Sequence, residues 1–168
     1  LLAMYLAWNR GFGPVDLCLL VGMYLIPGFG ITIGFHRYFS HKSFEASKPM
    51  IFLLGFCGSM AMQGPIFWWV ATHRCHHKHS DKELDPHSPY APGDHGRFRG
   101  FWHAHMGWLF RPSTDPVDKY IRDLKSQPML CWLDRNFLLV TFIGLLIPTV
   151  IGGLVTMSWM GALTGLLW

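Results

Sequence analysis

The chain has 168 residues, of which 51% are hydrophobic and only 14% are charged, and it contains eight Trp and thirteen Phe. This composition is typical of a one-domain integral membrane protein. The net charge of +4 comes without a basic stripe interleaved with base-stacking aromatics, which argues against a nucleic-acid partner.

Two long apolar runs predict transmembrane helices. Residues 13–35 form the first, and residues 137–156 form the second. Both reach the roughly 20 residues that a bilayer requires. Residues 1–8 resemble the end of an apolar helix, and residues 157–168 resemble the start of a further transmembrane helix. We therefore expect a single domain, residues 1–168, that is truncated at both ends.

The region between the two runs is mostly polar. Residues 49–62 are apolar but stop before Gln63-Gly64-Pro65, a length at which an interfacial helix competes with a membrane span. Residues 72–136 form the polar body, and within it residues 116–133 are amphipathic and predict one helix at the membrane surface. Arg10 is the only Lys or Arg outside residues 37–135, so the positive-inside rule places this region in the cytoplasm.

Histidines crowd the edges of the apolar segments. His36 and His41 follow the first run in "HRYFSH", and His73, His76 and His77 lie in "HRCHH". Spacings of three and four predict one helical face for the second set. A spacing of five does not, so we expect the first helix to end or unwind near residues 37–40.

These five histidines predict a metal site, because neutral imidazole is the commonest metal ligand and ionisable groups at membrane depth mark function. Cys75 lies among them but is predicted to point away from their shared face. The remaining candidates, His79, His95 and His103, are interpreted as ordinary surface histidines. The four cysteines show no metal or redox spacing and are expected to be reduced. An all-histidine site suits iron, copper or zinc, and spacing alone does not choose among them.

The histidine pattern and the segments around it resemble the membrane fatty acyl desaturases of the Δ9 stearoyl type. HX4H follows a membrane span, and HXXHH follows a short apolar helix. "GITIGFHRYFSHKSF", "MQGPIFWWVATHRCHHKHSD", "DPHSP" and "GFWHAHMGWLF" resemble successive segments of that family. The resemblance covers nearly the whole chain. It implies an all-α integral membrane fold whose transmembrane helices carry a cytoplasmic, histidine-rich helical cap.

The chemistry that this resemblance implies is oxidative. Two iron ions (a diiron centre), with O2 as co-substrate, would introduce a cis double bond, at Δ9, into a saturated acyl-CoA or acyl-lipid chain. The implied iron ligands are His36, His41, His73, His76 and His77.

The resemblance also assigns supporting residues. Gln63 and Trp69 would line the bend of an acyl tunnel, although Trp69 also suits the aromatic belt at a membrane interface. Asp85 would orient a ligand imidazole. His87, in the same DPH turn, and His105 would support the ligands from behind.

Location and partners follow from the same resemblance. Both histidine clusters must lie on one side of the membrane to share a site, so residues 49–71 are expected to form a non-spanning interfacial helix. The implied location is the bacterial inner membrane or the ER membrane, in contact with membrane lipid and with the histidines facing the cytoplasm. Electrons would come from a separate donor of the cytochrome b5 or ferredoxin type.

The sequence departs from the family at one important point. The family's third histidine cluster and the histidine of its fourth helix are absent from these 168 residues. Five histidines cannot complete the coordination of two irons, so we expect this piece alone to be inactive.

Two other interpretations stay open. A membrane diiron fatty acid hydroxylase or a front-end desaturase shares the histidine clusters but not the "QGP" and "GFWHAHMGWLF" segments. A histidine-rich metal transporter predicts histidines inside the spans, and residues 13–33 and 137–168 contain none.

Overall fold

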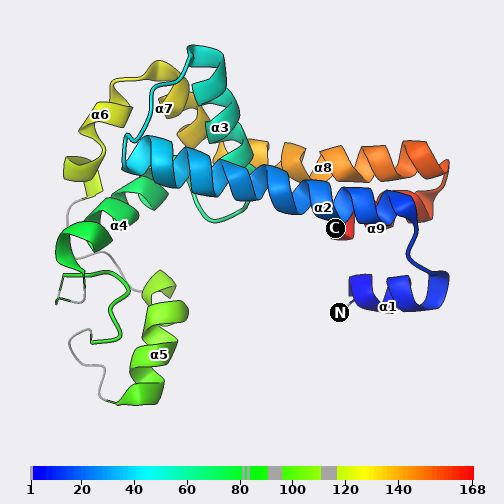
Figure 1. Cartoon of the computed structure of the whole chain (residues 1–168), viewed down its shortest axis with the longest axis horizontal. Coiled ribbons are helices and arrows are strands. Elements are labelled where there is room, and N and C mark those ends of the chain that lie inside the picture. Colours follow the sequence, from blue (N-terminus) through cyan, green and yellow to red (C-terminus); the bar gives the residue numbers. More distant parts are fainter. Residues whose placement is uncertain (1, 81, 83, 91–95, 111–116) are drawn as a thin grey trace.

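The computed structural model describes residues 2–80, 82, 84–90, 96–110 and 117–168, and every regular element within these ranges is a helix. Helix α2 (Pro14–Phe29) continues directly into a π-helix, η1 (Gly30–Ser40), and this long rod lies beside α8 (Phe137–Thr156) (Figure 1). The predicted all-α class is therefore confirmed for the described residues.

The two rods are long and apolar enough to cross a membrane. Pro14–Ser40 has 27 residues and contains an 18-residue window with a mean hydropathy of 1.9, and Phe137–Thr156 has 20 residues and contains such a window with a mean hydropathy of 2.4. At about 1.5 Å per residue the first rod is about 40 Å long, which exceeds the roughly 30 Å of a hydrocarbon core. A rod of this length extends beyond the apolar layer at one or both ends when it spans it.

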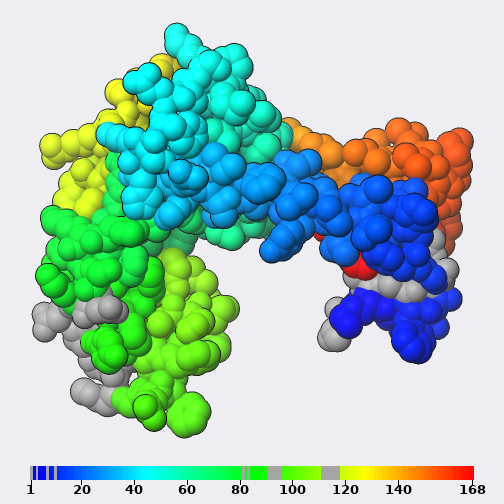
Figure 2. Space-filling view, in the orientation of Figure 1, coloured from blue at the N-terminus to red at the C-terminus, as the bar shows by residue number. Residues whose placement is uncertain are grey.

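Short helices surround both ends of this pair. At one end lie α1 (Leu2–Arg10) and α9 (Trp159–Leu167), and α9 packs back against α8. The helices of the histidine end are α3 (Lys48–Met60), α4 (Ile66–His79), α5 (Arg97–His105), η2 (Gly107–Phe110), η3 (Val117–Tyr120), α6 (Arg122–Lys125) and α7 (Pro128–Arg135). Figure 2 shows α5 and α1 projecting from the same side of the long rods, with a recess between them.

The segment expected to be one interfacial helix, residues 49–71, consists of two helices. Helix α3 ends at Met60, and α4 begins at Ile66 and runs through the second histidine cluster. Between them Met62 and Gly64 have positive φ values of 58° and 105°, and a Cβ at Gly64 would lie 2.7 Å from the Trp68 ring. The glycine therefore permits a tight turn that a larger residue would disturb.

The prediction of a single amphipathic helix at residues 116–133 is wrong. Residue 116 lies outside the described residues, and residues 117–135 form η3, α6 and α7 in succession. Pro128 stands at the first position of α7, where its missing N–H matters least, and it ends the preceding segment. The apolar residues recur at helical spacing as predicted, but the proline divides the segment into separate short helices.

The buried core lies at the histidine end of the rods. Its members come from η1, α3, α4, α6, α7 and α8 and include Phe35, Phe39, Ile66, Val70, Leu124, Leu130, Leu133 and Val140. Helix α3 approaches η1 so closely that a Cβ at Gly30 would lie 2.1 Å from the Gly58 nitrogen. This packing holds the elements that carry the histidines against one another.

Candidate metal centre

The π-helix solves the spacing problem of the first histidine pair. In η1 the His41 N–H donates to the His36 carbonyl at 3.1 Å, which is an i→i+5 bond. This wider turn stacks residues five apart, so His36 and His41 face the same side with ring centroids 4.6 Å apart. The helix ends at Ser40, within the expected residues 37–40, but it first widens into a π-helix, which the spacing alone did not predict.

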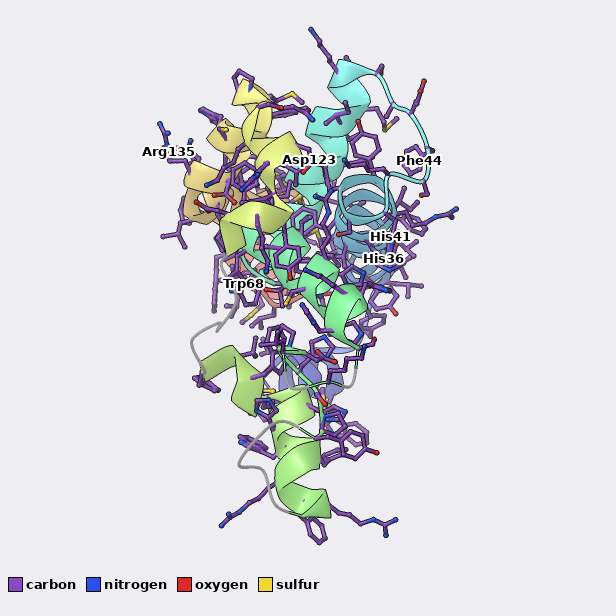
Figure 3. All side chains as sticks on the ribbon, turned by 90° about the vertical axis from the view of Figure 1, so that its left-hand side faces the viewer. His36, His41, Phe44, Trp68, Asp123 and Arg135 are labelled. Atoms are coloured by element: carbon purple, nitrogen blue, oxygen red, sulfur yellow. The ribbon has the colours of Figure 1, made fainter. Side chains whose placement is uncertain are left out.

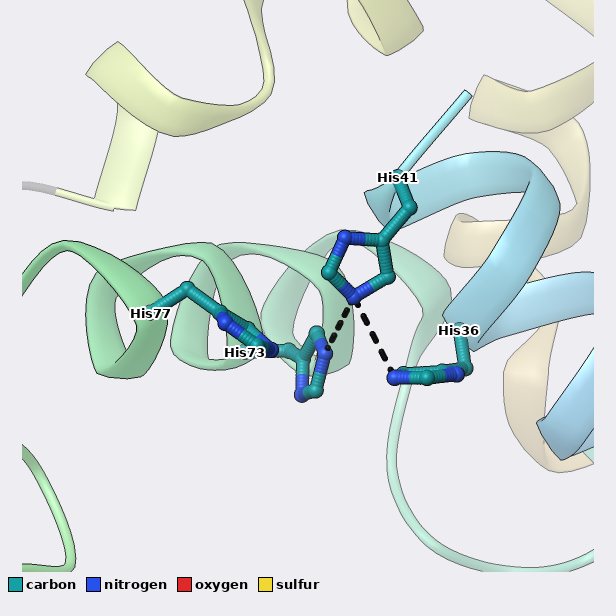
Figure 4. Close-up of side chains that lie close together, drawn as sticks. All are labelled: His36, His41, His73 and His77. Atoms are coloured by element: carbon teal, nitrogen blue, oxygen red, sulfur yellow. Dashed lines mark hydrogen bonds between the residues drawn. The ribbon is translucent and has the colours of Figure 1, made fainter. Parts of the chain in front are cut away.

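Helix α4 supplies the other pair. His73 and His77 are one turn apart, with ring centroids 4.6 Å apart, and both face η1 (Figure 4). One ligand nitrogen from each of His36, His41, His73 and His77 lies within 4.8 Å of the other three. We call these four residues the histidine cluster.

The nitrogen atoms of this cluster fit a metal ion. Nε2 of His41 lies 3.2 Å from Nε2 of His36 and 3.1 Å from Nε2 of His73. A neutral imidazole nitrogen offers either one hydrogen or one lone pair, so His41 Nε2 cannot hydrogen-bond both neighbours at once. Two nitrogens on a tetrahedral ion with metal–N bonds of about 2.0–2.1 Å would be roughly 3.3 Å apart. The nitrogens of His36, His41 and His73 are therefore spaced as ligands of one ion.

The cluster also favours neutral imidazoles. Burial, followed by the neighbouring His36 and His77, lowers the pKa of His73 to about 3. Burial, followed by His36 and His77, also lowers the pKa of His41. Because only the neutral ring has a lone pair for a metal, these shifts suit ligation at ordinary pH.

His76 does not join the cluster. Its Nδ1 lies 3.0 Å from both carboxylate oxygens of Asp85, which is 3% exposed, and its ring stacks on His87 at 4.2 Å. Asp85 Oδ1 also accepts from the His87 N–H at 3.2 Å. The single shared face expected for all three histidines of "HRCHH" is thus divided, since the DPH turn holds His76 to one side.

This second arrangement has chemistry of its own. A carboxylate on Nδ1 fixes the tautomer that leaves Nε2 of His76 with its lone pair. His76, Asp85 and His87 also offer ligand atoms within 4.8 Å of one another. A second ion could be held here through His76.

An apolar cavity adjoins the histidine cluster. It has a volume of about 740 Å³, and its lining residues are Met62, Gln63, Gly64, Pro65, Trp68, Trp69, Trp108 and Leu109. Trp69 Nε1 donates to Gln63 Oε1 at 3.2 Å, and the Trp69 ring stacks on His73 at 5.1 Å. The structure therefore brings both predicted substrate residues to one wall beside the histidines, with the stacked Trp68–Trp108 pair as a second wall.

Other predicted positions lie apart. His105 is exposed at the end of α5, where its Nδ1 lies 2.8 Å from the Phe101 carbonyl, and it is in neither histidine group. Cys75 is buried, with its Sγ 3.5 Å from the Leu84 carbonyl. His95 lies outside the described residues.

Sequence reasoning missed Arg74 and Asp123. Arg74 stands inside "HRCHH", and its guanidinium is bidentate to Asp123, at 2.8 and 3.0 Å. A cation next to metal ligands is unfavourable unless a carboxylate neutralises it. The positive charge of Arg74 among the histidines indicated that an acidic partner must lie nearby. The position of that partner in the sequence could not be found from residue spacing.

Comparison with known proteins identifies relatives of this chain. A family model described as fatty acid desaturase matches residues 12–168. A hex-5-enoyl-(acyl-carrier protein) acetylenase of Moorena producens is 41% identical over 99% of this chain and 53% of its own length. An sn-2 palmitoyl-lipid 9-desaturase of a Nostoc species is 37% identical over 90% of this chain and 52% of its own length.

A third relative comes from an animal. A delta(9)-fatty-acid desaturase of Caenorhabditis elegans is 37% identical over 77% of this chain and 38% of its own length. The chain spans about half the length of the first two relatives.

Proposed function

The chain belongs to the fatty acid desaturase family, and from this membership we propose that it forms the iron-binding part of an O2-dependent fatty acyl desaturase. The observation that carries the proposal is the convergence of His41 Nε2 on Nε2 of both His36 and His73. Iron is favoured over zinc or copper because the family is iron-dependent.

We assign one iron to the histidine cluster and a second iron to a site that includes His76. Iron, with O2 and two electrons, supplies the oxidising power to remove two hydrogens from an unactivated acyl chain. The role of the protein is to hold the ligands neutral and correctly oriented. Asp85 does this for His76 by accepting from its Nδ1.

The apolar cavity would hold the acyl chain. Its wall continues from Gln63 through Trp69 to His73, so a chain packed on that wall lies beside the proposed iron. Positioning of this kind brings one C–H pair to the oxidant and excludes others. Large aromatic side chains also keep water out of the site.

The proposed product is a cis-9 double bond in a saturated acyl chain, carried by CoA or by a membrane lipid. The names of the Nostoc and nematode relatives support position 9. A separate donor of the cytochrome b5 or ferredoxin type would deliver electrons.

We also propose an orientation in the membrane. The spans are Pro14–Ser40 and Phe137–Thr156, and the histidines face the cytoplasm of a bacterium or of an ER-containing cell. Helix α3 has 13 residues, about 20 Å at 1.5 Å per residue, which is too short to cross. It therefore lies with α4 on the same side as the end of η1.

Product analysis tests the activity. The complete protein that contains this sequence is expressed in a host supplied with an electron donor, and its fatty acids are analysed by gas chromatography–mass spectrometry. The wild type should form new cis-9 monounsaturated acids, His73→Ala should form none, and His79→Ala should match the wild type. Hydroxylated acids in place of alkenes would contradict desaturation and favour the hydroxylase alternative.

The acetylenase relative supports a second candidate activity. Its name describes action on an alkenoyl group on an acyl-carrier protein, and it is 41% identical to this chain. In the same experiment a protein of that type would leave saturated chains unchanged and convert a supplied terminal alkene into an alkyne.

A further inference from the structure

Arg74 ties the two histidine-bearing helices together. It belongs to α4, directly after His73, but its side chain extends toward the end of η1. Nε donates to the Ser40 carbonyl at 3.2 Å, and one terminal nitrogen donates to the Phe39 carbonyl. Both carbonyls belong to the last turn of η1, immediately before His41.

These contacts meet a need of the helix end. The last carbonyls of a helix have no donors within the helix, and a cation there is favoured by the helix dipole. Arg74 supplies both the donors and the charge. A side chain from the helix that carries His73 and His77 thus completes the helix that carries His36 and His41.

Asp123 fixes the guanidinium in this position. Its two oxygens accept from the two terminal nitrogens of Arg74 at 2.8 and 3.0 Å, and Lys42 Nζ lies 2.8 Å from one of them. Burial alone would raise the pKa of Asp123, but the hydrogen bonds from Arg74 and Lys42 outweigh it and hold the pKa well below its ordinary value. Figure 3 looks onto this end of the molecule and labels Asp123, His36 and His41.

Asp123 is held by a segment that we call the strap, Val117–Lys125. Its Ile121 and Leu124 are buried at 2% and 4% exposure, and the Tyr120 carbonyl accepts from Arg74. Lys78 of α4 lies over the Tyr120 ring at 5.7 Å. The strap is therefore packed into the core, which fixes the position of Asp123 relative to Arg74.

We propose that Arg74 is a positioning residue that holds the His36–His41 pair against the His73–His77 pair, with Asp123 and the strap keeping its guanidinium in place. This inference rests on the proposed metal centre. Apolar contacts between η1 and α4 tolerate small shifts, whereas ligand atoms must be held within about 0.5 Å of their productive positions. Directional bonds from one planar guanidinium supply that restraint.

Lysine cannot replace the arginine here. It keeps the charge but offers one compact ammonium in place of a planar fork of five donors. It cannot bond two carbonyls of η1, the Tyr120 carbonyl and both carboxylate oxygens together. Arg74→Lys therefore separates geometry from charge.

Cobalt(II) binding to the whole chain in detergent tests the proposal. Metal-free wild type, Arg74→Lys and Asp123→Asn are titrated with Co2+, and the visible absorption spectrum reports the ligand geometry. Asp118→Asn is the matched control, because Asp118 lies on the same strap and its exposed carboxylate pairs with Lys125 at 2.7 Å. Thermal unfolding of each metal-free variant is measured in parallel.

We expect Arg74→Lys and Asp123→Asn to weaken Co2+ binding by roughly tenfold or more, the scale seen when groups behind metal ligands are removed. We also expect the spectrum at saturation to change, which a loss of stability alone would not do. Asp118→Asn should match the wild type.

The outcomes separate the two proposals. Wild-type affinity and spectrum in both Arg74→Lys and Asp123→Asn would overturn the positioning role and leave the metal centre intact. No Co2+ binding by the wild type would overturn the metal centre and the positioning role with it. Should Arg74→Lys not fold, Asp123→Asn decides, because it preserves the size of the side chain and removes the carboxylate that keeps the Arg74 guanidinium in place.

Discussion

At the scale of single residues, His73 links the histidine cluster to the apolar cavity. It is a member of the cluster, and its ring stacks on Trp69 of the cavity wall. Its burial and its neighbouring histidines lower its pKa to about 3. An unfolded histidine has a pKa of about 6.5. Below about pH 6.5, His73 therefore binds a proton in the unfolded chain but stays neutral in the native protein.

This difference predicts a pH dependence of the metal-free protein. The contribution of neutral His73 to stability is complete above about pH 6.5 and is lost as pH falls toward the native pKa of about 3. NMR of imidazole-labelled protein should show His73 neutral at about pH 5, with the His73→Ala spectrum identifying its signal. A titration midpoint near the ordinary histidine value would contradict the environment described here.

A second prediction at this scale concerns Asp85. Asp85→Asn keeps the size of the side chain but removes the carboxylate that holds His76 Nδ1. We expect roughly 10- to 100-fold weaker metal binding at the second site, measured as iron retained after dialysis of the complete protein. Asp118→Asn, an exposed carboxylate, is the control. Equal iron retention in Asp85→Asn and the control would show that Asp85 does not orient a ligand.

The residue types at the site could be predicted from the sequence, but their grouping could not. Imidazoles at recurrent spacing indicate ligands because few other roles explain them. The separation of His76 from His73 depends on Asp85. A turn brings Asp85 back to α4, and the sequence does not reveal the geometry of that turn. Arg74 and Asp123 are 49 residues apart, and no local pattern links them.

At the scale of secondary-structure elements, the junction of η1 and α3 sets the position of the first histidine pair. A Cβ at Gly30 would lie 2.1 Å from the Gly58 nitrogen, whereas Gly28, half a turn earlier, has open space. Gly30→Ala should therefore destabilise the protein by about 1–3 kcal/mol through overpacking.

Gly28→Ala is the matched control, and we expect it to be neutral or stabilising by up to about 1 kcal/mol, because alanine favours a helix. Thermal unfolding in detergent measures both variants. Equal shifts would contradict the close approach of η1 to α3.

The type of these elements was predictable, but their local geometry was not. Apolar length gave the two spans. A periodicity of 3.6 residues cannot indicate a π-helix, so the spacing of His36 and His41 predicted the helix end near Ser40 but not the wider turns that precede it. Pro128 was visible in the sequence, but only the packed structure shows it as the start of α7.

At the scale of the whole molecule, a metal site shared by η1 and α4 requires both histidine-bearing helix ends to lie on one side of the membrane. Ser43 follows η1, Ser80 follows α4, and both are exposed. Single cysteines at these positions, in a chain lacking its native cysteines, should react with an impermeant reagent from the same side. Met157→Cys, beyond the far end of α8, should react from the opposite side. Labelling of Ser43→Cys and Ser80→Cys from different sides would refute this arrangement.

Metal binding by pair-deletion variants shows whether two helices share one ion through His36, His41, His73 and His77. X-ray absorption at the iron edge, on chain loaded with Fe2+ without oxygen, reports the nitrogen ligands. We expect histidine-bound iron in the wild type, and loss of the iron held by the histidine cluster, with less iron bound per chain, both in His36→Ala/His41→Ala and in His73→Ala/His77→Ala. Unchanged iron ligation in either double variant would contradict a site shared between η1 and α4.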